Sequence, residues 1–186
     1  KHLKPITDIF NGLVTGEAIG KTFAIAMPPG HGKTYCALLA MVWLCFRFKG
    51  IRICHVTYNA RQSQKFENTA RKFLRNTGAE LCEMNYAFKR LPNQVHVSQG
   101  LWQFGNSSEI FWTYKDSNAT GLHFNVMIMD DMTATKRDAY SNAINSELKE
   151  FVDSAVMTRS VVLGQMTTFL FNTRWSPKAL FAHLID

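Results

Sequence analysis

The eight-residue segment 27–34, with the sequence MPPGHGKT, constrains the fold of this chain more than any other feature. An apolar stretch, 22–26, precedes it, and a long apolar helical pattern begins near Tyr35. A strand, a glycine-containing loop that ends in Gly-Lys-Thr, and a helix together form the arrangement that holds the phosphates of a nucleoside triphosphate. The usual motif has glycine at the position of Met27, so this loop departs from the pattern at one residue.

The loop residues suit a phosphate chain chemically. Backbone N–H groups of the loop and the N-terminus of the helix are expected to face the phosphates. Lys33 is expected to reach the β and γ phosphates, and the Thr34 hydroxyl to bind Mg²⁺. His31 is interpreted as a residue that shapes the loop rather than as a base. The predicted nucleotide-binding residues are Pro29, Gly30, His31, Gly32, Lys33, Thr34 and Tyr35.

Composition indicates a folded globular domain, because 46% of the 186 residues are hydrophobic and only 19% are charged. The net charge of +7 favours a polyanionic partner such as nucleic acid, with a solvated basic surface as the alternative. The four cysteines lack the spacing of a zinc site and are read as reduced core residues. The longest apolar run, 35–46, is shorter than the about 20 residues that cross a bilayer. Because the chain begins at Lys1, we expect it to be a fragment.

Hydrophobic periodicity predicts strands that alternate with helices. Helices are expected over 5–15, 34–48, 59–77 and, in two pieces, 135–157; strands are expected over 22–27, 51–57, 95–97, 110–114, 124–129 and 168–172. Helix 34–48 is expected to be buried nearly all round. The aromatic residues between the middle strands are read as hairpin core rather than base-stacking residues: Trp102, Phe104, Phe111 and Trp112.

This alternation implies crossover connections, a mostly parallel sheet and helices on both of its faces. In such sheets, ligands bind beyond the carboxyl ends of the strands. The Gly-Lys-Thr loop, residues 130–131 and residues 172–174 all follow predicted strands. We therefore expect them to meet at one edge of the sheet.

Two adjacent carboxylates follow the apolar strand 124–129. Asp130 is expected to hold Mg²⁺ opposite Thr34, and Asp131 to polarise the water that attacks the γ-phosphate. The alternative for Asp131 is a cap on the helix that follows. Asn172 and Thr173 either sense the phosphate or form a plain strand-end turn, and for Arg174 a structural role is preferred.

Basic residues on the predicted helix 59–77 are read as a solvated face, with a DNA-contacting surface as the alternative. They are Arg61, Lys65, Arg71, Lys72 and Arg75. His55, His96 and His123 have no spacing that indicates a site, and they are read as ordinary residues.

Taken together, these segments resemble the ATPase domain of the large terminase subunit, the motor that packages DNA into tailed-bacteriophage and herpesvirus capsids. The resemblance rests on segments 26–34, 56–60, 120–131 and 172–175, and it spans nearly the whole chain. The Pro-Pro-x-His-Gly-Lys loop and the Thr-Arg-Trp ending are closer to phage terminases than to helicases or other P-loop proteins.

The resemblance implies an ASCE-type P-loop NTPase, a three-layer α/β sandwich that forms a single ATPase domain over residues 1–186. It implies ATP and Mg²⁺ as ligands. Lys33 and Asp131 match the catalytic residues, Thr34 and Asp130 the metal ligands, and Asn172 with Thr173 the motif that couples hydrolysis to DNA movement. Family members often carry arginine where this chain has Gly30, so a phosphate-sensing arginine is expected elsewhere in the chain or in a neighbouring subunit.

The implied partners are double-stranded DNA, further copies in a ring on the portal, and the small terminase subunit, in the host cell cytoplasm without a membrane. The family's C-terminal nuclease domain is expected to be absent, so no DNA cleavage is expected. Two alternatives remain. Another DNA-dependent P-loop ATPase, such as a helicase or translocase, usually shows Asp-Glu-x-His or Asp-Glu-x-Asp after the strand, where this chain has DDMT. The other is a basic nucleic-acid-binding module that holds phosphate without hydrolysis.

Overall fold

The computed structural model describes residues 3–76, 80–83, 94–98, 100–117, 122–133, 135–162 and 165–173. All eight of the described strands belong to one sheet, in the order β1-β8-β7-β2-β6-β5-β4-β3. The strands are β1 (Thr22–Ala26), β2 (Arg52–Thr57), β3 (Glu80–Glu83), β4 (Gln94–Ser98), β5 (Leu101–Phe104), β6 (Glu109–Tyr114), β7 (Val126–Asp130) and β8 (Thr167–Asn172).

Four neighbouring pairs are parallel: β1 with β8, β8 with β7, β7 with β2, and β2 with β6. Only β5 runs antiparallel to both of its neighbours, and β4 and β3 pair in parallel beyond it. The predicted mostly parallel sheet is therefore confirmed. β3 and β5 were not predicted; β5 is only four residues long and lies between two turns.

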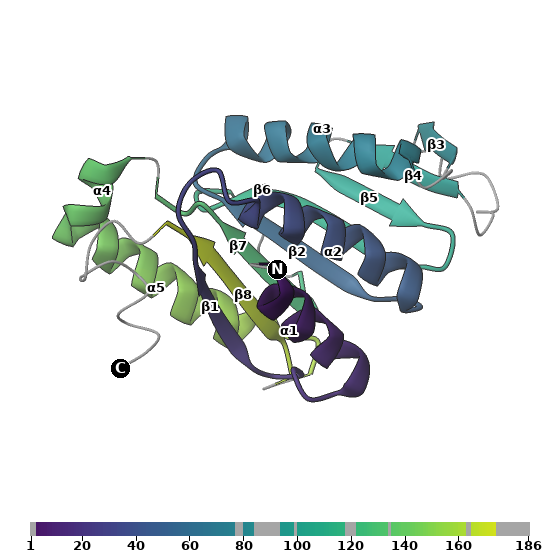
Figure 1. Ribbon diagram of the computed structural model, residues 1–186, viewed down its shortest axis with the longest axis horizontal. Coiled ribbons are helices and arrows are strands. Elements are labelled where there is room, and N and C mark those ends of the chain that lie inside the picture. The colour runs from purple at the N-terminus through teal and green to yellow at the C-terminus, as the bar shows by residue number, and fades with distance from the viewer. Residues whose placement is uncertain are drawn as a thin grey trace.

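Helices cover both faces of the sheet (Figure 1). One face packs against α1 (Lys4–Thr15), α2 (Lys33–Arg47) and α3 (Ala60–Asn76), and this core includes Ile53, Ile128 and Phe169. The other face packs against α5 (Asn142–Thr158), and its core includes Cys54, Met127 and Leu170. Successive strand residues point to opposite faces, so neighbours such as Ile53 and Cys54 belong to different layers. The three-layer α/β arrangement predicted from the sequence is thus confirmed.

Local signals explain the helix limits. α1 has Pro5 in its first turn and ends at Gly16, whose φ of 87° is the left-handed conformation that glycine tolerates best. The short helix α4 (Lys136–Tyr140) begins with a capping box, in which Thr135 and Asp138 each accept a hydrogen bond from the other's backbone N–H. The predicted division of 135–157 into two helical pieces is confirmed as α4 and α5.

The expectation that helix 34–48 is buried nearly all round is wrong. One face of α2 is open to solvent, and Tyr35, Leu39, Trp43 and Phe46 on that face are 58%, 51%, 39% and 43% exposed. The reason is that α2 lies in a single helical layer, with the sheet beneath it and helices only at its sides (Figure 1). Among the described helices, none is both long enough and apolar enough to span a membrane.

Most aromatic and cysteine interpretations hold. Trp102, Phe104 and Trp112 are buried in the core beneath α2 and α3. Cys45 and Cys54 are free buried thiols, whereas Cys36 is only half-buried. Burial raises the pKa of Cys54 to about 12, so this thiol stays protonated at neutral pH.

Candidate active site

Four segments converge at the carboxyl edge of the parallel strands, at the upper left of Figure 1. They are the loop after β1, the ends of β7 and β8, and the start of α3 directly after β2. Together they surround a cleft of about 790 Å³. Its lining residues are Pro29, Lys33, Tyr58, Asn59, Arg61, Gln62, Lys65, Asp131, Thr133 and Thr173. The expected meeting of the three predicted segments at one sheet edge is confirmed.

The loop between β1 and α2 depends on two glycines. Gly30 and Gly32 have φ values of 78° and 81°, in the left-handed region that disfavours other residues. Gly32 is the N-cap of α2 and has no side chain to occupy the free N–H groups of the first turn. Nδ1 of the exposed His31 lies 3.0 Å from the Pro29 carbonyl oxygen, which agrees with its interpretation as a loop-shaping residue. The result is an uncapped helix N-terminus at the cleft, where an anion is stabilised.

Lys33 is the first residue of α2, and it extends into the cleft while remaining only 7% exposed. Its Nζ atom donates a hydrogen bond to Oγ1 of Thr173 at 3.1 Å and forms an ion pair with Oδ1 of Asp131 at 3.2 Å. A buried ammonium group needs such partners, because an unpaired charge loses the solvation of water. The three side chains therefore form one charged cluster, contributed by the start of α2 and by the residues that directly follow β7 and β8.

Asp130, the last residue of β7, is fully buried, and neither of its carboxylate oxygens has a hydrogen-bond partner among the described residues. Burial first, and then the charge of Asp131, raise the pKa of Asp130 to about 7. The Thr34 hydroxyl and the Lys33 charge act in the opposite direction. A buried carboxylate whose charge is offset only weakly, by a hydroxyl and a backbone N–H nearby, is a site that a cation would stabilise.

These donors fit Mg²⁺, which prefers hard oxygen ligands and is commonly held by one or two carboxylates together with phosphates and water. Within the described ranges, no three His, Cys, Asp or Glu side chains gather into a metal-binding cluster. A Mg²⁺ ion at Asp130 and Thr34 would therefore take its other ligands from phosphate and water.

Asp131 follows β7 with a φ of 49°, which is unusual for a residue other than glycine. Its backbone N–H donates to the Phe171 carbonyl at 3.0 Å, and this bond ties the turn to β8. Such a conformation costs on the order of 1 kcal/mol or more, and strained residues of this kind concentrate at functional sites. The alternative reading of Asp131 as a helix cap is wrong, because Thr135 caps α4 and the Asp131 carboxylate pairs with Lys33.

Asn172 and Thr173 end β8 inside the site, where both are buried. Oδ1 of Asn172 accepts hydrogen bonds from the Thr173 backbone N–H at 2.8 Å and from the Thr133 hydroxyl at 3.4 Å. Nδ2 of Asn172 has no partner within the described part of the chain. The pair therefore links Lys33, through Thr173, to the loop that follows Asp131.

His55 was read as an ordinary residue, but it lies directly behind Asp130. β2 and β7 pair so that His55 is opposite Ile128 and Thr57 opposite Asp130, which puts His55 and Asp130 diagonally on one sheet face. Nε2 of His55 is 4.0 Å from Oδ2 of Asp130. Burial lowers the pKa of His55 to about 3, so its imidazole is neutral and the two groups do not form an ion pair. The proximity of His55 to Asp130 follows from the register between β2 and β7 and cannot be seen in the sequence.

The sequence favoured a solvated face for Arg61 and Lys65, with a DNA-contacting surface as the alternative. Both residues are exposed, as that interpretation expects, and they also line the cleft, which was not predicted. The available signal was the position of α3, which starts right after a strand whose carboxyl end reaches the site. Conversely, Tyr35 lies on the outer face of α2 and contacts the ring of Phe73 rather than lining the cleft. Arg174 lies outside the described residues.

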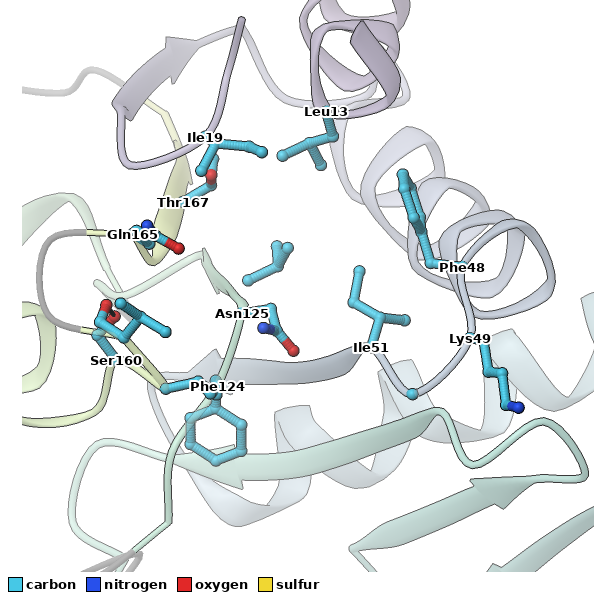
Figure 2. Close-up of a pocket in the computed structure, with 14 residues that line it drawn as sticks. Leu13, Ile19, Phe48, Lys49, Ile51, Phe124, Asn125, Ser160, Gln165 and Thr167 are labelled. Atoms are coloured by element: carbon cyan, nitrogen blue, oxygen red, sulfur yellow. Dashed lines mark hydrogen bonds between the residues drawn. The ribbon is translucent and has the colours of Figure 1, made fainter. Parts of the chain in front are cut away.

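A second pocket, of about 260 Å³, lies at the opposite edge of the sheet (Figure 2). Residues next to the starts of strands form it, among them Ile19, Ile51, Asn125 and Thr167, while Lys49 points away from it (Figure 2). Ligands of parallel sheets bind at the other edge, so this pocket is not the candidate active site.

No protein-family model matches the sequence, and no curated protein matches it. The fold does match solved structures. The large terminase of bacteriophage HK97 superposes with a TM-score of 0.59 at 13% sequence identity, covering 89% of this chain and 32% of that one. The chain therefore shares its α/β fold with a phage large terminase. It spans about a third of the HK97 protein. The large terminase ATPase domain of Thermus phage P74-26 matches at a TM-score of 0.48 and 13% identity, over 83% of this chain and 76% of that one.

The strand order brings the segments of the site together at neighbouring strands. β8 lies between β1, which leads into the phosphate-type loop, and β7, which ends in Asp130. The predicted α/β fold with a mostly parallel central sheet is therefore confirmed.

Proposed function

We propose that this chain is the ATP-hydrolysing motor domain of a viral DNA-packaging terminase, which couples ATP hydrolysis to the movement of double-stranded DNA into the procapsid. The observation that carries the proposal is the cluster of the buried Lys33 and Thr173 with the half-buried Asp131, next to the buried Asp130 and at an uncapped helix N-terminus. These are the groups that phosphoryl transfer to water requires, at the sheet edge where P-loop proteins bind nucleotides.

In this mechanism, the backbone N–H groups of the loop and the Lys33 ammonium bind the phosphates, as the dipole of α2 favours. Asp130 and Thr34 would hold Mg²⁺, which neutralises charge on the phosphate oxygens. Phosphate then replaces Asp131 as the partner of Lys33, because both anions compete for one ammonium group. Release from that ion pair frees the Asp131 carboxylate to orient the attacking water and accept its proton.

Asn172 and Thr173 would then report the state of the phosphate. Thr173 accepts a hydrogen bond from Lys33, so movement of Lys33 toward phosphate would remove this bond. Asn172 connects the same turn to Thr133 and hence to the segment before α4. Loss of phosphate would in this way shift the loops at the site, which is how P-loop switches transmit hydrolysis.

The net charge of +7 supports double-stranded DNA as the polyanionic partner. The further partners in this proposal are other copies of the chain in a ring on the portal and the small terminase subunit, in the host cell cytoplasm. The fold shared with the HK97 large terminase supports this part of the proposal.

The test measures phosphate release from ATP over a range of protein concentrations, with and without double-stranded DNA. We expect Lys33→Ala to abolish turnover and Lys72→Ala to leave it unchanged, because Lys72 is an exposed lysine outside the cleft. Turnover that rises faster than linearly with concentration would support cooperation between subunits. If Lys33→Ala hydrolysed ATP as fast as the unmodified chain, the proposed site would be wrong.

A further inference from the structure

One wall of the cleft is cationic, and the proposed mechanism does not yet use it. The first two turns of α3 contribute Arg61, Gln62 and Lys65 to a lining that also includes Pro29 and Lys33. Arg61 and Lys65 are four residues apart, so their side chains project from the same face of the helix. The opposite face of α3 is buried against the sheet, which fixes the orientation of the cationic face toward the cleft.

Both cationic groups are available to a ligand. Arg61 and Lys65 are exposed, and neither forms an ion pair with any residue in the described ranges. Arg71, further along the same helix, differs, because its guanidinium donates to the buried carboxylate of Glu67 at 2.9 Å. The start of α3 therefore presents unneutralised positive charge to the cleft, while the middle of the helix uses its arginine structurally.

Strand order places this charge relative to a bound nucleotide. The loop follows β1, Asp131 follows β7, and α3 follows β2, with the strands arranged β1-β8-β7-β2. A phosphate chain that starts at the loop and points its last phosphate at Asp131 therefore runs toward α3. Arg61 and Lys65 lie at the end of that path, beyond Asp131 as seen from the loop.

The charges in the cleft also indicate a need for cations there. Asp131 already pairs with Lys33, and Asp130 adds a second carboxylate behind it. A terminal phosphate next to these two carboxylates meets like charge. Lys33 and the Mg²⁺ that Asp130 and Thr34 would hold offset part of this repulsion, and positive groups on α3 would offset more of it. A diphosphate ends before this point and does not need them.

We propose that Arg61 and Lys65 bind the terminal phosphate of the nucleotide and make the site select triphosphate over diphosphate. This inference rests on the proposed function, since it requires a phosphate chain held by Lys33. Arginine is suited to the role because its planar guanidinium forms two parallel hydrogen bonds with phosphate oxygens.

The test compares the Kd values of a non-hydrolysable ATP analogue and of ADP, both with Mg²⁺, by fluorescent-nucleotide displacement. Arg61→Gln and Lys65→Gln remove charge at the cleft; Arg75→Gln and Lys72→Gln are matched controls, exposed on the same helix but outside the cleft. We expect Arg61→Gln to weaken the ATP analogue about tenfold or more, the scale of one charged hydrogen bond, and to leave ADP within about twofold. The controls should change neither Kd.

Other outcomes overturn the inference in distinguishable ways. If both Arg61→Gln and Lys65→Gln weaken ADP as much as the ATP analogue, the cations do not select the terminal phosphate. If neither Kd changes but binding to double-stranded DNA falls, this face of α3 contacts DNA instead. If the unmodified chain and Lys33→Ala bind the analogue equally poorly, the proposed function fails, and the inference fails with it.

Discussion

Replacing Asp130 by asparagine should stabilise the nucleotide-free and metal-free chain. Asp130 is fully buried, and within the described residues no hydrogen bond satisfies its carboxylate. Ionised Asp130 therefore bears a desolvation penalty that ligand binding would offset. Asparagine has nearly the same shape and no charge, so Asp130→Asn removes the penalty without opening a cavity.

The pKa of Asp130 sets the size of the effect. It rises from an ordinary value of 3.8 to about 7, and each pKa unit corresponds to about 1.4 kcal/mol. The folded chain thus holds this proton more tightly than the unfolded chain, so stability falls as the pH rises from about 4 to about 7. Above that range the penalty is complete, with an upper bound of about 4 kcal/mol. Relaxation around the charge reduces it, and we expect about 2–4 kcal/mol.

The assay is thermal unfolding of both chains in a metal chelator, between about pH 4 and about pH 8. At the high end the Tm of Asp130→Asn should exceed that of the unmodified chain by about 5–15 °C, since 1 kcal/mol moves the Tm of a chain this size by about 2–4 °C. Near pH 4, where Asp130 is protonated, the difference should disappear. His55 is present in both chains, so its titration largely cancels.

Asp8→Asn is the matched control, because Asp8 is exposed on α1 and forms a surface ion pair with Lys4. This control should show no comparable pH-dependent gain. A difference between Asp130→Asn and the unmodified chain that is independent of pH, or a loss of stability at high pH, would refute the argument. Either result would mean that the carboxylate of Asp130 is solvated or paired in solution.

Three further predictions concern the site and its support. Asp131→Asn should retain ATP binding but lose hydrolysis, as nucleotide titration and phosphate release would reveal; normal turnover would remove Asp131 from the mechanism. Arg71→Ala should lower the free energy of unfolding by about 1–3 kcal/mol in urea, because it leaves the buried Glu67 without its cation, whereas Arg75→Ala at an exposed position should change it by less than about 0.5 kcal/mol. Gly32→Ala should lower the free energy of unfolding by about 1–2 kcal/mol, because the φ of Gly32 is 81°. The same substitution should weaken ATP binding. An unchanged Kd for ATP would show that nucleotide binding does not depend on the loop conformation.

Local sequence signals were enough to predict the main segments of the site. Gly32 and Lys33 stand between an apolar strand and a helical pattern, and Asp130 follows an apolar run that only a buried strand explains. Such signals work because turn chemistry and hydrophobic periodicity act over a few residues. Their convergence was also predictable, since the carboxyl ends of parallel strands lie at one edge of the sheet.

Other features required the packed structure. His55 lies behind Asp130 only because of the register between β2 and β7, which nothing near His55 in the sequence specifies. The outer face of α2 carries Leu39 and Trp43 yet remains exposed, because the helical layer is one helix deep there. When a helix is apolar on all sides, its sequence does not show whether a further layer of structure covers its outer face.

The sequence by itself determined the nature of the site: the phosphate-type loop, the paired carboxylates and the strand ends that carry them. The tertiary structure decided which groups surround it, including the Lys33–Asp131 ion pair and the orientation of Arg61 and Lys65 toward the cleft. The physical reason is the distance along the chain over which the interactions act. A loop conformation or a strand depends on residues close along the chain, whereas burial, strand register and ion pairing depend on residues that only folding brings together.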